Sequence, residues 1–348
     1  MRVAVVTDHV PFIRGGAEIL LEDLVEALAR CGHEVAVVRL PWKWHPSDAI
    51  LRSIAVARLI DLSSELDVPA ELIIGLKFPA YLLPHSRKVI WLVHQHRSVY
   101  DLWGNEFGLS QAPEGQSIAE AVIRADRSAM TEARRRFAIS ANVARRLRDS
   151  LGLVAEVLRP PVRREELYWC HSFEPYLFFP SRLSPLKRHS LVLQALRLTE
   201  NPVELHIAGA PDHLGMIRAL EREVAELDLE DRVRWLGHLE EPELRRRYSR
   251  CRAVVFPPFD EDYGYVALEA LLSGKPVITC TDSGGVVDTL GDSGAGWIVE
   301  PSPRALAAAM DEAWEDHQVC RSRGEVGPHR YRELCPGWEA IVESLLCA

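Results

Sequence analysis

The sequence predicts an α/β protein made of two doubly wound domains. Short apolar runs alternate with amphipathic stretches along the chain, a pattern typical of parallel sheets covered by helices. The alternation stops once, at residues 158–163, and then starts again. The chain has 348 residues, of which 47% are hydrophobic, so it is long enough and apolar enough for two cores.

The first domain should begin with a strand over residues 2–7, which is buried on both faces because it barely alternates. A helix over 18–30 should follow, since its leucines share one face and Gly32 is well placed to end it. The other elements expected before the break are strands at 35–40, 72–76, 89–93 and 137–140 and helices at 118–136 and 142–151.

A pair of prolines marks the domain boundary. Pro160 and Pro161 lack backbone donors and stiffen the chain, as expected of a linker, so the predicted domains are 1–162 and 163–329. Two such domains that face one another have a cleft between the carboxyl ends of their sheets. The second domain should contain strands at 176–179, 203–208, 233–236, 253–256, 277–279 and 297–299, with helices between them, including one at 189–198. A final amphipathic helix is expected at 330–346, after the second domain.

Charge and composition exclude several classes of protein. A net charge of −9 disfavours a nucleic-acid binder. No apolar run approaches the roughly 18–20 residues that a membrane span needs. The seven cysteines are scattered and lack metal-ligand spacing, which suits reduced thiols in a cytoplasmic protein.

Two glutamates bracket the expected start of a helix in the second domain. Glu261 lies in the preceding loop and Glu269 lies within the helix. Between them, Gly264 lets the backbone turn and approach a ligand closely. The first amides of the helix have no partner inside it and so offer a phosphate site. Carboxylates suit sugar hydroxyls, so this segment fits a ligand that contains both sugar and phosphate.

Two cations precede this segment in the chain. Arg182 directly follows the strand expected at 176–179, and Lys187 lies near the start of the helix at 189–198. An arginine fork and a mobile ammonium suit a diphosphate, which gains negative charge as its bond to sugar breaks. The alternative is two solvated basic residues, but a helix dipole disfavours them there unless an anion lies between.

Further candidates follow strands of the first domain. Gly15 and Gly16 come after the first strand, where they either ease a tight turn or let the amide of Gly16 contact phosphate or sugar. They match neither a G-x-G-x-x-G fingerprint nor a phosphate loop. His94 follows the strand at 89–93, where it either caps that strand or donates a hydrogen bond to a sugar hydroxyl.

No metal site is expected. His94-x-His96 has no evident third ligand. The triplet at 260–262 resembles a chelating D-x-D, but the cations already serve the diphosphate, so we interpret it as fortuitous. The segment 284–288 fits a simple turn and a loop lining a nucleotide pocket equally well.

Basic clusters and aromatic segments complete the set of candidates. The arginine clusters at 134–136, 145–148 and 245–247 are interpreted as solvated helix faces. The minority interpretation is a surface for an anionic acceptor or lipid headgroups, hence a weak peripheral membrane contact. The aromatic segments at 42–45 and 100–104 could stack on an acceptor sugar, although ordinary packing is the more common role.

Together these residues resemble the retaining glycosyltransferases of sequence family four, the glycosyl transferases group 1, which have the GT-B fold of two Rossmann-like domains facing a central cleft. The matching features are residues 15–18, His94, Arg182 with Lys187, Glu261-x7-Glu269 and the segment 284–288. That segment departs from the family's usual G-G-x-P-E because Val287 replaces proline and Asp288 replaces glutamate. The glycine often seen before the arginine is also lacking.

The resemblance implies transfer of a sugar from a UDP-, GDP- or dTDP-linked donor to a hydroxyl of a glycan, glycolipid or small-molecule glycoside. It implies retention of the anomeric configuration and no metal. Arg182 and Lys187 would bind the diphosphate, Glu269 the ribose, and Glu261 and His94 the donor sugar. The segment 330–348 would pack back on the first domain. The implied donor-binding residues are Gly15, Gly16, Arg182, Lys187, Glu261, Gly264, Tyr265, Val266 and Glu269, and the implied catalytic residues are Glu261, His94, Arg182 and Lys187.

Other classes fit the sequence less well. A nucleotide-sugar epimerase on this architecture should show paired carboxylates and histidines, and a glycoside phosphorylase should show a pyridoxal-phosphate lysine in a much longer chain. Neither pattern is evident. A non-catalytic partner subunit would be favoured by loss of a charged site residue, yet all four, Arg182, Lys187, Glu261 and Glu269, are present.

Overall fold

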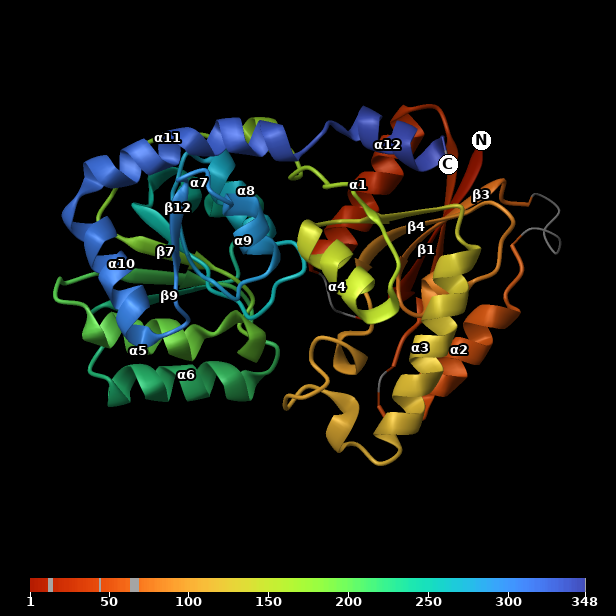
Figure 1. Ribbon diagram of the computed structural model, residues 1–348. Coiled ribbons are helices and arrows are strands. Elements are labelled where there is room, and N and C mark those ends of the chain that lie inside the picture. Colours follow the sequence, from red (N-terminus) through yellow and green to blue (C-terminus); the bar gives the residue numbers. More distant parts are fainter. Residues whose placement is uncertain (12–14, 44, 63–68, 348) are drawn as a thin grey trace. The chain divides into compact units, whose positions relative to one another are not determined.

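The computed structural model describes residues 1–11, 15–43, 45–62 and 69–347 (Figure 1). The chain divides into two compact units, Met1–Arg163 with Pro336–Ala348, and Arg164–Cys335. Each unit contains a parallel six-stranded sheet, which confirms the predicted α/β class with two doubly wound domains. Within the described ranges, no helix is both long and apolar enough to cross a bilayer.

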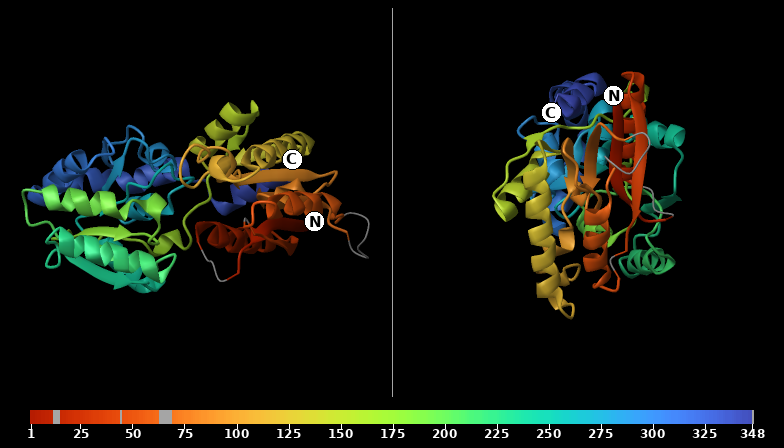
Figure 2. Two further views of the ribbon diagram at one scale, coloured as in Figure 1. Left: turned by 90° about the horizontal axis from the view of Figure 1, so that it is seen from below. Right: turned by 90° about the vertical axis from the view of Figure 1, so that its right-hand side faces the viewer.

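The sheet of the first unit has the order β2-β1-β3-β4-β5-β6, and helices lie on both of its sides (Figure 2). Its predicted strands are confirmed, while β6 and α2 were not expected from the sequence. The strands are β1 (Arg2–His9), β2 (Glu34–Pro41), β3 (Leu72–Lys77), β4 (Lys88–His94), β5 (Arg135–Ala138) and β6 (Glu156–Val157). The helices are α1 (Gly16–Arg30), α2 (Ala49–Leu59), α3 (Gly115–Glu132), α4 (Ala141–Leu151) and α12 (Trp338–Leu346).

Two helix predictions in this unit were wrong at their ends. The helix expected at 118–136 ends at Glu132, because Arg135 and Arg136 pair with β4 as part of β5. These two arginines therefore lie on a strand and not on a solvated helix face. The helix expected at 330–346 is interrupted, since Pro336 lacks a backbone donor and α12 begins only after Gly337.

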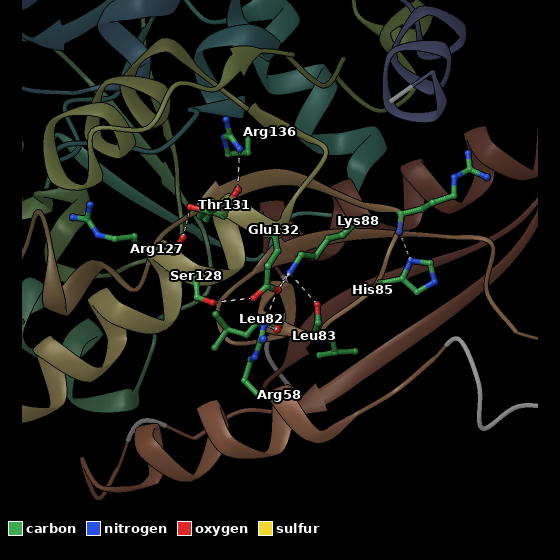
Figure 3. A network of polar contacts seen from close by, with 12 residues as sticks. Arg58, Leu82, Leu83, His85, Lys88, Arg127, Ser128, Thr131, Glu132 and Arg136 are labelled. Atoms are coloured by element: carbon green, nitrogen blue, oxygen red, sulfur yellow. Dashed lines mark hydrogen bonds and ion pairs between the residues drawn. The ribbon is translucent and has the colours of Figure 1, made fainter.

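An ion network around the buried Lys88 ties α2, β4 and α3 together (Figure 3). Lys88 is fully buried, and its Nζ donates to the carbonyl of Leu83 at 3.1 Å and to Glu132 Oε2 at 3.0 Å. Arg58 Nη1 donates to the same carboxylate oxygen at 2.7 Å, and Ser128 donates to the other oxygen at 2.9 Å. Burial raises the pKa of Glu132, but these hydrogen bonds outweigh it and hold the pKa at about 2.

The sheet of the second unit has the order β12-β11-β10-β7-β8-β9, and its strands are confirmed with ends that differ by at most two residues from those expected. The strands are β7 (Leu177–Pro180), β8 (Leu205–Ala208), β9 (Val233–Gly237), β10 (Ala253–Val255), β11 (Val277–Cys280) and β12 (Gly296–Val299). The helices are α5 (His189–Leu198), α6 (Leu214–Glu226), α7 (Glu241–Arg250), α8 (Tyr265–Leu272), α9 (Gly285–Leu290), α10 (Pro303–Glu315) and α11 (His317–Leu334).

The strand order of the second unit reverses between β7 and β10. The chain runs outward from β7 to β9, returns to β10 and runs outward again to β12, and β7 pairs with β10 through Phe178 and Val254. In open parallel sheets, ligands bind beyond the carboxyl ends of the strands at such a reversal. The loops that follow β7 and β10 are therefore the first place to look for a site.

Candidate functional site

The loops after β7 and β10 bring Lys187 and Glu261 into contact. Lys187 Nζ donates to Glu261 Oε2 at 2.5 Å and lies 5.2 Å from the ring centroid of Phe256. The two side chains are 17% and 21% exposed, so the pair is shielded but open to a ligand. A cation and a carboxylate at the strand reversal can bind an anionic group and a hydroxyl side by side.

Arg182 follows β7 but does not join this pair directly. Its Nε lies 3.2 Å from Asp212 Oδ1, and its side chain is 49% exposed. Leu183, the next residue, bridges to Pro211 in the loop after β8. Arg182 is thus held over the neighbouring loop, with its guanidinium facing solvent and its charge balanced by a carboxylate that the sequence did not single out.

Backbone hydrogen bonds join three loops around the Lys187–Glu261 pair. The amide of Phe259 donates to the carbonyl of Leu186 at 2.7 Å, which joins the loop after β10 to the loop after β7. The amide of Asp260 donates to the carbonyl of Asp282 at 2.9 Å, and that of Gly285 donates to the carbonyl of Glu261 at 2.7 Å. These last two bonds add the loop after β11.

Glycines are required where these loops meet. A Cβ at Gly285 would lie 2.7 Å from the carbonyl oxygen of Asp262, which is too close for any side chain. Gly284 and Gly264 have φ values of 55° and 87°, and both precede a helix. A Cβ at Gly264 would also meet Val286 Cγ2 at 2.8 Å. The glycines at 264, 284 and 285 therefore let the loop before α8 pack tightly on the loop before α9.

Gly264 is the N-cap of α8, whose first two residues are Tyr265 and Val266. The first amides of a helix point away from its own carbonyls, so this end of α8 presents donors and the positive end of a dipole. Gly264 has no side chain that would cover them. The helix start that the sequence pattern predicted is therefore present, next to Glu261 in the same loop, and phosphate binding there stays a prediction.

Glu269 lies on α8 and is held by tyrosines from two other segments. Tyr248 on α7 donates its hydroxyl hydrogen to Glu269 Oε2 at 2.7 Å, and Tyr168 also forms a hydrogen bond with this carboxyl group. Burial raises the pKa of Glu269 to about 7, against the opposing effect of both tyrosines. Sequence reasoning missed both tyrosines, since neither belongs to a recognisable motif.

In the first unit, Gly15 and Gly16 follow β1 in the chain, and His94 is the last residue of β4. Gly15 is the N-cap of α1, which begins at Gly16, and its amide donates to Glu18 Oε2 at 2.8 Å. His94 Nδ1 lies 2.7 Å from the carbonyl of Gln95. A carbonyl only accepts, so this contact puts a proton on Nδ1.

His96 and the aromatic candidates of this unit are packed. The His96 ring stacks on Phe78 at 5.4 Å and meets Trp42 edge-on at 5.4 Å, and burial lowers its pKa to about 4. Tyr100 donates to the buried Asp126 at 2.7 Å. The ordinary packing role therefore describes Trp42 and Tyr100, while Trp44 lies outside the described residues.

Residues 171–330 match the family model of the glycosyl transferases group 1. The matched residues lie within the second unit and make up most of it. A D-inositol 3-phosphate glycosyltransferase from Geodermatophilus obscurus is 31% identical over 182 residues, which are 49% of this chain and 39% of that protein. Its counterpart from Frankia alni is also 31% identical, over 49% of this chain and 44% of that protein. The chain thus spans about two fifths of the length of these curated relatives.

Solved structures of other proteins share the whole fold. A sucrose-phosphate synthase from Thermosynechococcus elongatus matches with a TM-score of 0.77 at 19% identity, over 99% of this chain and 97% of that one. WaaG, a glycosyltransferase involved in lipopolysaccharide biosynthesis, matches with a TM-score of 0.74 at 15% identity, over 99% and 100%. Anabaena HepE in complex with UDP matches with a TM-score of 0.73 at 18% identity, over 100% of both chains. The GT-B fold that the sequence resemblance implied is confirmed.

Proposed function

We propose that this protein transfers a sugar from a nucleotide diphosphate sugar to a hydroxyl group of an acceptor. The observation that carries the proposal is the Lys187–Glu261 pair at the strand reversal of a glycosyl transferases group 1 unit, beside the amino end of α8. A diphosphate needs cations and amides, and a sugar needs a carboxylate. This corner supplies all three in one place.

The diphosphate would be bound by Lys187, Arg182 and the first amides of α8. In the structure, each cation is paired with a carboxylate, Lys187 with Glu261 and Arg182 with Asp212. These carboxylates compensate the charge of both cations before the donor binds. On binding, phosphate oxygens would replace the carboxylates or share the cations with them. Glu261 would then accept hydrogen bonds from hydroxyls of the donor sugar.

The nucleoside would be anchored by Glu269. Its carboxylate oxygens can accept both ribose hydroxyls while Tyr248 and Tyr168 keep it oriented. From the first unit, the amide of Gly16 would contact the diphosphate and His94 would contact the donor sugar. With its proton on Nδ1, a neutral His94 ring would accept a hydrogen bond from a sugar hydroxyl through Nε2, instead of donating one as expected from the sequence.

Transfer would retain the anomeric configuration. The acceptor hydroxyl would attack from the side of the leaving group, and the departing phosphate oxygen would take its proton. Lys187 and Arg182 would stabilise the charge that grows on the diphosphate, so we expect no metal to be needed. UDP and UDP-glucose are bound by HepE, which shares the fold, and this makes UDP-sugars the first donors to test, ahead of GDP- and dTDP-sugars.

A thermal-shift panel of UDP-, GDP- and dTDP-sugars tests the donor site, because a ligand that binds only the folded state raises the melting temperature. We expect one nucleotide class to raise it in the wild type and not in Lys187→Ala. Turnover with and without EDTA then tests the metal. Failure of all three nucleotide classes to shift the melting temperature would contradict the proposed function.

A further inference from the structure

Arg188 has a backbone conformation that is costly for a residue with a side chain. It lies between the short turn Pro185–Lys187 and α5, with φ 57° and ψ 44°, in the left-handed region. Glycine adopts this conformation without steric cost, whereas other residues do so at the expense of stability. A large side chain at such a position calls for a compensating contact.

The Arg188 side chain makes that contact across two loops. Its Nη1 and Nη2 donate to Asp282 Oδ1 at 2.8 Å and Oδ2 at 2.6 Å, a bidentate ion pair. The guanidinium carbon also lies 4.9 Å from the ring centroid of Phe259. Lysine cannot reproduce this combination, since it has neither the planar fork nor the flat face.

These contacts connect the same three loops that carry the candidate site. Arg188 directly follows Lys187, Phe259 lies two residues before Glu261, and Asp282 lies in the loop whose Gly285 amide binds the Glu261 carbonyl. Backbone hydrogen bonds join these loops in pairs, and the guanidinium touches side chains of two of them at once. It therefore links the segment that carries Lys187 to the segment that carries Glu261 and to the loop after β11.

We infer that Arg188 is a positioning residue of the donor site, acting through Asp282 and Phe259 and not through contact with the donor. Part of this inference rests on the proposed function, namely that the held loops bind a nucleotide diphosphate sugar. The other part, that Arg188 restrains the loops, stands on the contacts alone. The two parts need separate measurements.

The experiment compares wild type with Arg188→Gly, Arg188→Lys and Asp282→Asn. Hydrogen exchange is first measured without ligand, over residues 256–263 and 281–285. Arg188→Gly relieves the backbone cost, so its melting temperature should not fall much, yet amides in both loops should exchange faster. Arg250→Ala, which removes the pair with Glu174 elsewhere in the same unit, is the matched control and should leave these loops unchanged.

The second measurement is calorimetric titration with UDP. Arg188→Gly and Asp282→Asn should each weaken binding about tenfold, the loss of roughly one charge-assisted contact, and the double variant should be no weaker than either one. Arg188→Lys should fall between wild type and Arg188→Gly.

Unchanged loop exchange in Arg188→Gly overturns the restraint. Faster exchange with unchanged UDP affinity overturns the positioning role while the proposed function stands. Should no nucleotide bind the wild type, the proposed function fails, and the exchange data still decide the restraint.

Discussion

Tyr248 on α7 donates its hydroxyl hydrogen to Glu269 on α8 at 2.7 Å, in an environment where burial raises the pKa of Glu269 to about 7. The carboxyl group proposed to bind the ribose therefore changes charge near neutral pH. Its two tyrosine partners act against burial and help to keep it ionised.

Nucleotide affinity should fall as the pH is lowered from about 8 to about 6, because the protonated carboxyl group loses acceptor capacity for the ribose hydroxyls. Calorimetric titration of UDP across this range measures it. Glu269→Gln should bind weakly with a nearly flat profile. An affinity that is independent of pH in the wild type would contradict the role given to Glu269.

The raised pKa of Glu269 also affects folding. The protonated carboxyl group contributes stability below pH 4.5, the ordinary pKa of a glutamate, and this contribution is lost as the pH rises through about 7.

Tyr248→Phe should move the midpoint of that pH profile upward, since it removes a hydrogen bond that lowers the pKa of Glu269. The measurement is the same titration series. Tyr176→Phe is the matched control, because the Tyr176 hydroxyl donates at 2.9 Å to the carbonyl of Arg247 instead of to Glu269. An equal shift in both variants would rule out a specific effect of Tyr248.

Lys187→Ala and Glu261→Ala should each abolish sugar transfer while the protein stays folded. Each also leaves a shielded partner without its counter-charge, so the free energy of unfolding should fall by about 1–3 kcal/mol. Circular dichroism and a transfer assay separate the two effects. Wild-type rates in either variant would remove that residue from the site.

Gly285→Ala should destabilise the second unit by about 1–3 kcal/mol and weaken nucleotide binding, because the added methyl would lie 2.7 Å from the carbonyl oxygen of Asp262. Chemical denaturation and UDP titration measure both effects. Gly104→Ala is the matched control, since a Cβ there meets nothing within 4 Å. If the two variants have equal stability and equal UDP affinity, close packing of the loop before α8 on the loop before α9 is not required for either.

Glu132→Ala should lower the free energy of unfolding by about 3 kcal/mol, because it leaves the buried ammonium of Lys88 without its carboxylate. Glu120→Ala, which removes an exposed pair with Arg124, should change it by less than about 1 kcal/mol. In the wild type, the contribution of Glu132 to the free energy of unfolding is present above pH 4.5, the ordinary pKa of a glutamate. It is lost as the pH falls through about 2. Acid titration of the variant should lack this step, and an unchanged acid profile would contradict the assignment.

The sequence predicted the strands of both sheets except β6, and the order of the candidate residues along them. Lys187 and Glu261 follow strands that are each recognisable from apolar runs, and the pairing of β7 with β10 then brings them together. Periodicity alone failed where tertiary pairing decided the outcome. Arg135 and Arg136 continue a helical pattern, yet strand pairing with β4 takes them into β5.

The partners of the charged residues were harder to predict. Asp212, Asp282 and Tyr248 lie in a turn, a loop and an arginine-rich helix, and no spacing rule links them to Arg182, Arg188 and Glu269. Such pairs depend on how loops fold back on one another, which is a property of the assembled unit. Arg188 is next to Lys187 in the sequence, but only its positive φ in the structure indicated a separate positioning role.

Lys187 and Glu261 are 74 positions apart in the chain. The ribosome must synthesise the whole intervening segment, which includes β8 and β9, before β10 can pair with β7 and the contact can form. Contacts of such long sequence separation carry a large loop-closure cost and tend to form late in folding. Nucleotide binding should therefore require the fully folded second unit. Chains that end before residue 261 should not bind the nucleotide, however much secondary structure they contain.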